Sequence, residues 1–149
     1  MSPYRLFNQG RLRSDSIRYR NLLSGNIGIS SSRIVLGTSS SPFLHAWAWS
    51  NVTGFGAKTT NPISSVSGEV TDIQQTSSVA FVSNYNSPYI NAYSWFGGFG
   101  SKYSDPATLP GFYATSITYN SASPAVAVSD YSSPYVDAYP WSNSTGFGT

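Results

Sequence analysis

The sequence predicts an all-β protein, and three observations support this fold class. The chain repeats itself at a fixed interval, its short stretches of alternating apolar and polar residues are typical of strands, and Ser, Asn, Gly and Pro separate these stretches. Aromatic residues make up 15% of the 149 residues, whereas charged residues make up only 9%. Disordered chains are poor in aromatic residues and usually rich in charge. We therefore expect a folded chain with an apolar core.

The repeat consists of three similar segments that begin 46 residues apart. They read SPFLHAWAWSNVTGFGAK, SPYINAYSWFGGFGSK and SPYVDAYPWSNSTGFG, and the first of them begins at Ser41. Each segment carries a tryptophan at the same point, and these residues are Trp49, Trp95 and Trp141. The second copy is two residues shorter between its tryptophan and its Gly-Phe-Gly triplet. The repeat unit is therefore about 46 residues long.

Each repeat unit reads as four short strands. In the second unit we expect strands at residues 69–75, 79–83, 89–95 and 98–103, because turn-forming residues lie between these stretches. Four strands in about 46 residues is the size of one blade of a β-propeller. The sequence thus predicts three propeller-like four-stranded blades, at about residues 26–62, 63–106 and 107–149. We expect breaks near Pro62 and Pro106, because the residue before a proline favours extended backbone and the surroundings are polar.

The third strand of each unit has two unlike faces, because successive side chains of a strand point to opposite sides. The bulky face of the second unit carries Tyr89, Asn91, Tyr93 and Trp95. Its shallow face carries Ile90, Ala92 and Ser94. The third unit repeats this division 46 residues later. Such faces suit stacked sheets, because the bulky face of one sheet can fill the shallow face of the next.

An extended basic arm, residues 1–25, precedes the repeats. Five arginines against Asp15 give this segment a charge of +4, whereas the body of the chain carries −2. Such an arm suits either nucleic acid or an acidic protein surface. Nucleic-acid binders usually spread basic charge over a folded face, which this acidic body does not offer, so nucleic acid is the less favoured partner. We expect the arm to clamp a neighbouring subunit, with these candidate assembly contacts: Arg5, Arg11, Arg13, Arg18 and Arg20.

One pattern in the sequence resembles a known family. It is SPY-x-x-AY-x-WS followed by GFG-x-KYS-x-PATLP, and it is similar to the WD-repeat-like β-propeller repeats of phage structural proteins. The resemblance covers about residues 26–149 and is closest in the second unit, through Pro106 to Pro110. It implies a propeller-like body and a location in the virion, and it assigns no catalytic residues. The chain departs from the family in having only three units, where the family's propellers usually need more to close.

The sequence offers no set of residues that would support catalysis. His45 is the one histidine, and it occupies the position held by Asn91 and Asp137 in the other units. A position that accepts these three residue types is typical of a tolerant polar position on a strand. With one histidine and no cysteine, neither a His-based metal cluster nor a nucleophile and base pair can be assembled. We therefore expect no enzyme activity, no cofactor and no metal.

The repeated aromatic residues leave two interpretations open. In the first, they form an inter-blade core, for which the candidates are Trp49, Trp95, Trp141, Phe55, Phe99 and Phe147. The glycines of each Gly-Phe-Gly triplet would then allow a tight hairpin or a bulge. In the second, the rings stack on sugars while amides bind sugar hydroxyl groups, and repetition of the ring makes the protein multivalent.

Taken together, these features predict a non-enzymatic structural protein of a phage particle, a head or tail component. Three blades are too few to close a propeller, which typically has four to eight. We therefore expect a homo-oligomer that docks onto other virion proteins through its arm and blade edges. The alternative is a multivalent, lectin-like propeller protein that binds a glycan. No stretch approaches 18 apolar residues, so we expect no membrane span.

Overall fold

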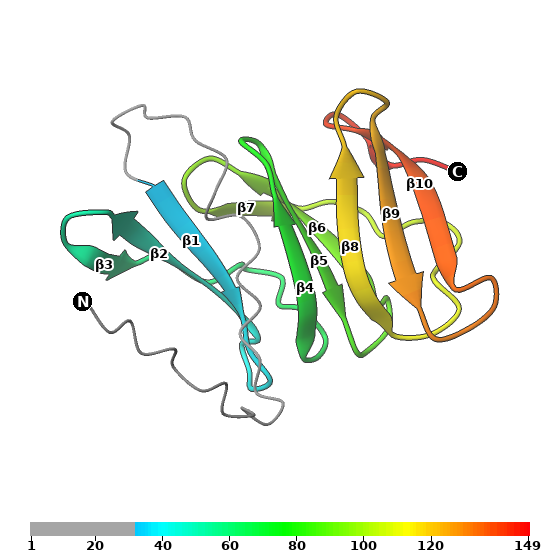
Figure 1. The fold of residues 1–149 in the computed structure, drawn as a ribbon, viewed down its shortest axis with the longest axis horizontal. Helices are drawn as coiled ribbons and strands as arrows, with labels where there is room; N and C mark the ends of the chain where they lie inside the picture. Colours follow the sequence, from blue (N-terminus) through cyan, green and yellow to red (C-terminus); the bar gives the residue numbers. More distant parts are fainter. Residues whose placement is uncertain (1–31) are drawn as a thin grey trace, which may run out of the picture.

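The computed structural model describes residues 32–149, and all regular structure in this range is β-strand. The prediction of an all-β fold is therefore confirmed, and no helix occurs in this part of the chain. The strands, shown in Figure 1, are β1 Ser32–Gly37, β2 Leu44–Ser50, β3 Gly54–Lys58, β4 Val70–Gln75, β5 Val79–Asn84, β6 Ile90–Trp95, β7 Phe99–Lys102, β8 Ala114–Asn120, β9 Ala125–Asp130, β10 Val136–Ser142 and β11 Gly146–Phe147.

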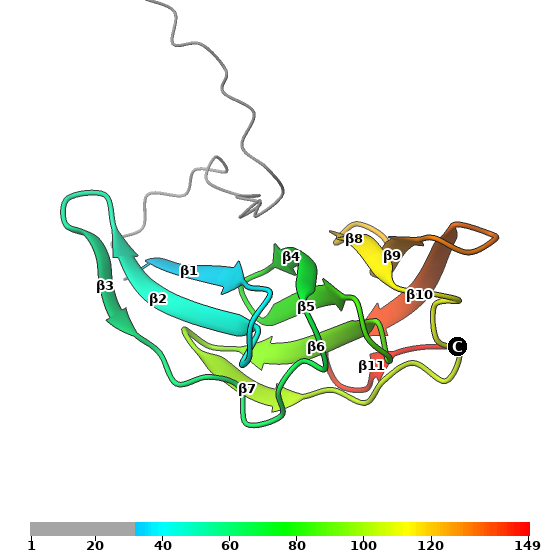
Figure 2. The same ribbon diagram turned by 90° about the horizontal axis from the view of Figure 1, so that it is seen from below.

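The strands form three antiparallel sheets, one for each repeat unit. The first sheet has the order β1-β2-β3, the second β4-β5-β6-β7 and the third β8-β9-β10-β11. The sheets follow one another along the molecule in chain order (Figure 1). In Figure 2, β4 and β8 lie on one side of the molecule, whereas β7 and β11 lie on the opposite side. The three sheets form an open series, so the two outer sheets each have one face with no further sheet of the described chain over it.

The second sheet contains the four strands that the sequence predicted, and their ends differ from the predicted ends by one residue at most. This agreement arises because each strand stops at local turn chemistry, such as the Ser-Pro segment before β6 or the glycines before β7. The first sheet has three strands within the described residues. A fourth predicted strand of that unit, together with the arm, lies outside them. Pro62 and Pro106 lie in the connections between sheets.

The loop at the repeated Ser-Pro has one conformation in all three sheets. Each Ser-Pro bond is cis, and the next residue has a positive φ, at 63° for Phe43, 67° for Tyr89 and 68° for Tyr135. The backbone N–H of that residue donates to the carbonyl three residues earlier, as between Tyr89 and Asn86 at 2.8 Å. Positive φ is uncommon for residues other than glycine. The shared loop therefore shows that the sequence repeat is a repeat of backbone geometry.

The Gly-Phe-Gly triplets lie at the hairpin and the bulge that the sequence predicted from their glycines. Gly54 and Gly146 have φ values of 74° and 85°, a region that glycine enters at no steric cost. The second glycine of the triplet lies where the register shifts, between Trp47 and Trp49 in the first sheet. At the equivalent Gly100, an added Cβ would lie 2.3 Å from the Ser94 Oγ. Glycine is thus needed at both positions of the first and third triplets, whereas in the second triplet the positive φ lies one residue earlier, at Gly97, with a value of 75°.

Polar contacts hold neighbouring sheets together along their first strands. The Asp72 carboxylate on β4 accepts hydrogen bonds from the Ser116 hydroxyl at 2.7 Å and the Ile117 N–H at 3.3 Å, both on β8. The Thr71 hydroxyl donates to the Ala114 carbonyl at 2.6 Å. Asp72 is buried, and buried carboxylates are stable only with such partners. These bonds fix the second sheet against the third.

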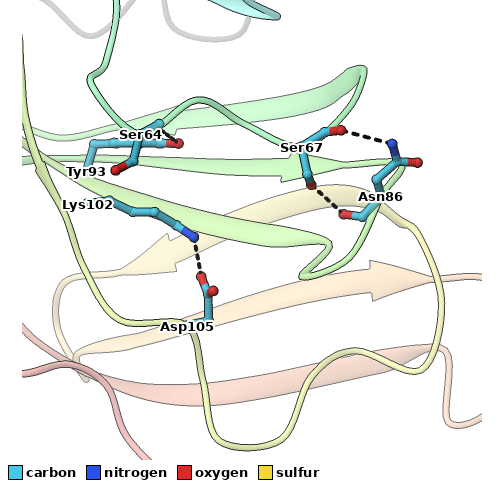
Figure 3. Close-up of polar contacts among 6 residues, drawn as sticks. All are labelled: Ser64, Ser67, Asn86, Tyr93, Lys102 and Asp105. Carbon is cyan, nitrogen blue, oxygen red and sulfur yellow. Dashed lines mark hydrogen bonds and ion pairs between the residues drawn. The ribbon is translucent and has the colours of Figure 1, made fainter.

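The connection before the second sheet is also fixed by hydrogen bonds, as Figure 3 shows. The buried Tyr93 donates its hydroxyl to the Ser64 carbonyl at 2.9 Å. The Asn86 amide donates to the Ser67 carbonyl at 2.9 Å, and the Ser67 hydroxyl returns a bond to the Asn86 carbonyl at 3.1 Å. Lys102 pairs with Asp105 at 2.7 Å after β7 (Figure 3). These bonds hold parts of both connections against the second sheet.

Candidate functional site

Two of the three repeated tryptophans lie between sheets. Trp95 of the second sheet is 4% exposed and packs in one cluster with Ala46 and Val35 of the first sheet. Trp141 of the third sheet is buried too, with its ring edge-on to Phe81 of the second sheet at 4.6 Å between centroids. In both cases the bulky face of one sheet covers the shallow face of the sheet before it.

A tryptophan and a phenylalanine form the same pair in every repeat. Their centroids are 5.1 Å apart in each sheet, with interplanar angles of 75°, 77° and 79°, for the pairs Trp49–Phe55, Trp95–Phe99 and Trp141–Phe147. Edge-to-face contacts of this kind add roughly 0.5–1.5 kcal/mol beyond the burial of area. The pairs arise because the register of each hairpin places the phenylalanine directly opposite the tryptophan.

The pair in the first sheet is not covered like the other two. Trp49 is half-buried, and Phe55, which we expected in the core, is 53% exposed. Its equivalents Phe99 and Phe147 are partly buried against the core clusters. The reason is position in the series, because the described chain places no sheet over the bulky face of the first sheet.

The third sheet is open on its other side. Val136 is 59% exposed, whereas Ile90 and Leu44 at the same repeat position are 0% exposed. Ala138 and Pro140, next along the same face, are exposed as well. The shallow face of this last sheet therefore presents apolar side chains to solvent.

In the second and third sheets, the polar residue on the third strand lies next to a second polar residue on the neighbouring strand. The amide of Asn84, in the orientation that satisfies its hydrogen bonds, accepts from the Asn91 amide at 2.7 Å. In the third sheet the same two positions hold Asp130 and Asp137, and burial and the neighbouring carboxyl raise the pKa of Asp137. In the first sheet, burial and nearby Lys58 lower the pKa of His45. These residues fill structural positions, and in residues 32–149 no group of three His, Asp or Glu could hold a metal ion.

A groove of about 440 Å3 lies between the second and third sheets. The β4–β5 turn, β5, and the ends of β8 and β10 line it with hydroxyl, amide and aromatic groups, among them Gln74, Thr76, Ser77, Ser78, Phe81, Tyr119, Trp141 and Asn143. The Trp141 indole N–H donates to the Asn143 side chain at 2.8 Å, so its hydrogen-bond donor is already used. Phe81 stacks on Tyr119 and contacts Trp141, so the groove offers ring edges and hydroxyl groups more than a free ring face.

An exposed aromatic cluster, which sequence reasoning missed, lies at the other end of the same two sheets. Tyr113 stacks between Tyr85 and Tyr131, with centroids 4.4 Å and 4.7 Å away, and Phe112 lies beside it. Three of these four rings are 45–64% exposed: Tyr85, Phe112 and Tyr131. Tyr85 and Tyr131 are 46 residues apart, which was the available signal, but Tyr113 comes from a connection that shows no clear repeat.

The five arginines of the arm lie outside the described residues, so their role as assembly contacts stays a prediction. No helix in residues 32–149 is long and apolar enough to cross a membrane. No family model, no curated protein and no solved structure matches the chain. The features of residues 32–149 that bear on function are the repeat, the two open sheet faces, the groove and the aromatic cluster.

Proposed function

We propose that this chain is a non-enzymatic structural protein of a phage particle, a head or tail component that acts as an oligomer. Its three sheets are consecutive blades of a propeller-like body, and its arm and blade edges dock onto other virion proteins. The observation that carries this proposal is the pair of open end faces. Positions that are fully buried inside the series are largely exposed at its ends, as with Ile90 and Val136.

Three features support the propeller-like arrangement. The blades follow in chain order, each blade is a meander, and the first strands of the second and third blades bond through Asp72. The bulky face of each blade fills the shallow face of the blade before it, as the packing of Trp95 and Trp141 illustrates. Three blades subtend too little arc to close, since propellers typically have four to eight. A closed ring would therefore need further blades, which a second copy could supply.

The location in a virion is supported by the similarity of the repeat to WD-repeat-like phage structural proteins and by the basic arm. Arginine forms bidentate pairs with carboxylates, which suits docking onto an acidic protein surface. A clear test is the protein content of purified particles. Peptides of this chain in a digest of the particle would support the proposal, and their absence from a complete digest would overturn the virion location.

The oligomer is tested by light scattering on the full-length chain after gel filtration. We expect a mass that is a multiple of 16.1 kDa. A well-folded, soluble monomer at micromolar concentration would contradict the proposal, because large open apolar faces are rare on monomers.

A second candidate function is glycan binding, and the groove between the second and third blades favours it. Its hydroxyl and amide groups, from Ser78 and Asn143 among others, suit sugar hydroxyl groups. A glycan panel read by intrinsic tryptophan fluorescence tests this function. If a glycan binds there, Asn143→Ala should weaken binding while Phe96→Ala, at a side chain 86% exposed and away from the groove lining, should leave it unchanged. A panel with no binder, or equal binding by both variants, would rule the groove out.

A further inference from the structure

Residues 32–149 leave two sheet faces open, and these correspond to two faces that pack against each other inside this part of the chain. The first blade presents an open bulky face with Trp47, Trp49 and Phe55. The third blade presents an open shallow face with Val136 and Ala138. Inside the chain, contacts between a bulky and a shallow face occur twice, between the first and second blades and between the second and third.

We infer that the bulky face of the first blade docks onto the shallow face of the third blade of a second copy. Two such contacts close two chains into a ring of six blades with two-fold symmetry. The inference rests on the proposed oligomer and specifies its interface. Six blades fall within the usual range of four to eight, whereas three copies would give nine.

The 46-residue repeat predicts which side chains meet. Trp95 packs against Ala46 and Val35 of the preceding blade. Trp49 is the equivalent of Trp95, and Ala138 and Ala127 are the third-blade equivalents of the two residues that Trp95 contacts. Trp49 should therefore pack against Ala138 and Ala127 of the second copy. Tyr93 packs with Leu44 and Val35, so Trp47, its equivalent in the first blade, should lie against Val136 and Ala127 of the second copy.

The sizes of the residues at the two ends are complementary. The bulky face of the first blade has Trp47 where the other blades have Tyr93 and Tyr139. The shallow face of the third blade has Ala127 where the second blade has Phe81. The largest side chain at one position thus meets the smallest at the other. Compared with the equivalent positions in the other blades, one end face has a larger residue and the other a smaller one, so the two faces can fit each other.

The end blades carry net charges of opposite sign. The described part of the first blade, residues 32–62, contains Arg33 and Lys58 and no acidic residue. The third blade, residues 107–149, contains Asp130 and Asp137 and no lysine or arginine. Opposite net charges favour the approach of a first blade to a third blade at long range. At the proposed contact itself, Lys58 lies on the docking bulky face, whereas Asp137 lies on the bulky face of the third blade, away from the shallow face that docks.

The test uses two variants that each block one face. Phe55→Arg places a charge on the bulky face, and Val136→Arg places one on the shallow face. Both side chains are more than half exposed in the single chain, so each variant should keep its strand content by circular dichroism. Ile63→Arg, at a connection residue that is 98% exposed, is the matched control.

Light scattering on the full-length proteins gives the readout. We expect the wild type and the control at twice 16.1 kDa, and each blocking variant alone at the monomer mass. An equal mixture of the two blocking variants should form a dimer again, because it contains one intact bulky face and one intact shallow face.

The other results are distinguishable from one another. If only one variant loses the dimer and mixing restores nothing, the contact joins like faces and the inference is wrong. If both variants remain dimeric, another surface joins the copies, so the inference fails while the proposed oligomer stands. A monomeric wild type overturns both.

Discussion

The second sheet and the two end sheets are built from the same repeat, yet their side chains have different surroundings. Ile90 in the middle is completely buried, whereas Val136 at the end is 59% exposed. Asn91 is buried, whereas His45 and Asp137 at the same position are half-buried. Burial in a repeat protein is therefore set by the neighbouring unit as much as by the residue itself. Changes at equivalent positions should have unequal effects.

The largest difference is expected at the tryptophans. Trp95→Ala should lower the free energy of unfolding by about 3 to 5 kcal/mol, because it leaves a cavity between two sheets. Trp49→Ala should cost clearly less in dilute solution, where its ring is half-buried. Urea unfolding of both variants at low protein concentration measures this. Equal losses would show that Trp49 is covered within the single chain, and a loss for Trp49→Ala that grows with protein concentration would point to burial in the oligomer.

A smaller effect is expected where β1 and β4 approach each other. At Gly37, an added Cβ would lie 2.3 Å and 2.5 Å from two side-chain carbons of Val70, one of which is the rigid Cβ. Gly37→Ala should therefore cost on the order of 1–3 kcal/mol, as overpacking does. Gly98→Ala is the control, because no atom lies within 4 Å of its added Cβ. Thermal unfolding should separate the two variants, and an unchanged melting temperature for Gly37→Ala would show that the first two sheets can separate slightly without loss.

The smallest effect concerns pH. The folded chain raises the pKa of Asp137 above its ordinary value of 3.8, so the folded state binds a proton more tightly than the unfolded state. The stability that this proton contributes is present below the ordinary pKa and is lost as pH rises through the raised pKa. Asp137→Asn copies Asn91 of the second sheet and should remove that loss. Between pH 3 and pH 7, the melting temperature of the wild type should fall relative to that of the variant as pH rises, and parallel curves would contradict this.

Local chemistry explains what could be predicted from the sequence. The strands of the second sheet end at Ser, Pro and Gly, and these signals act within a few residues. The positions of Trp95 and Trp141 between sheets followed from the alternation along one strand. Both kinds of inference need only the repeat unit itself.

The exposure of Phe55 could not be predicted in this way. Its Gly-Phe-Gly triplet matches those of Phe99 and Phe147, and only the place of its sheet in the series distinguishes it. The aromatic cluster around Tyr113 escaped prediction for a related reason, since this residue reaches Tyr85 and Tyr131 from a connection that shows no clear repeat. Long-range packing decides these cases, and sequence spacing does not encode it.

One hairpin of the repeat shows how the protein can accept foreign sequence. The turn after the repeated tryptophan differs in length among the three units, yet the tryptophan still lies opposite the same phenylalanine, as Trp95 lies opposite Phe99 in the shortest copy and Trp141 opposite Phe147 in a longer one. The strand pairing has thus already absorbed a change of two residues. This turn is a natural insertion point, where an epitope or a short peptide could be displayed while the pairing below it is kept.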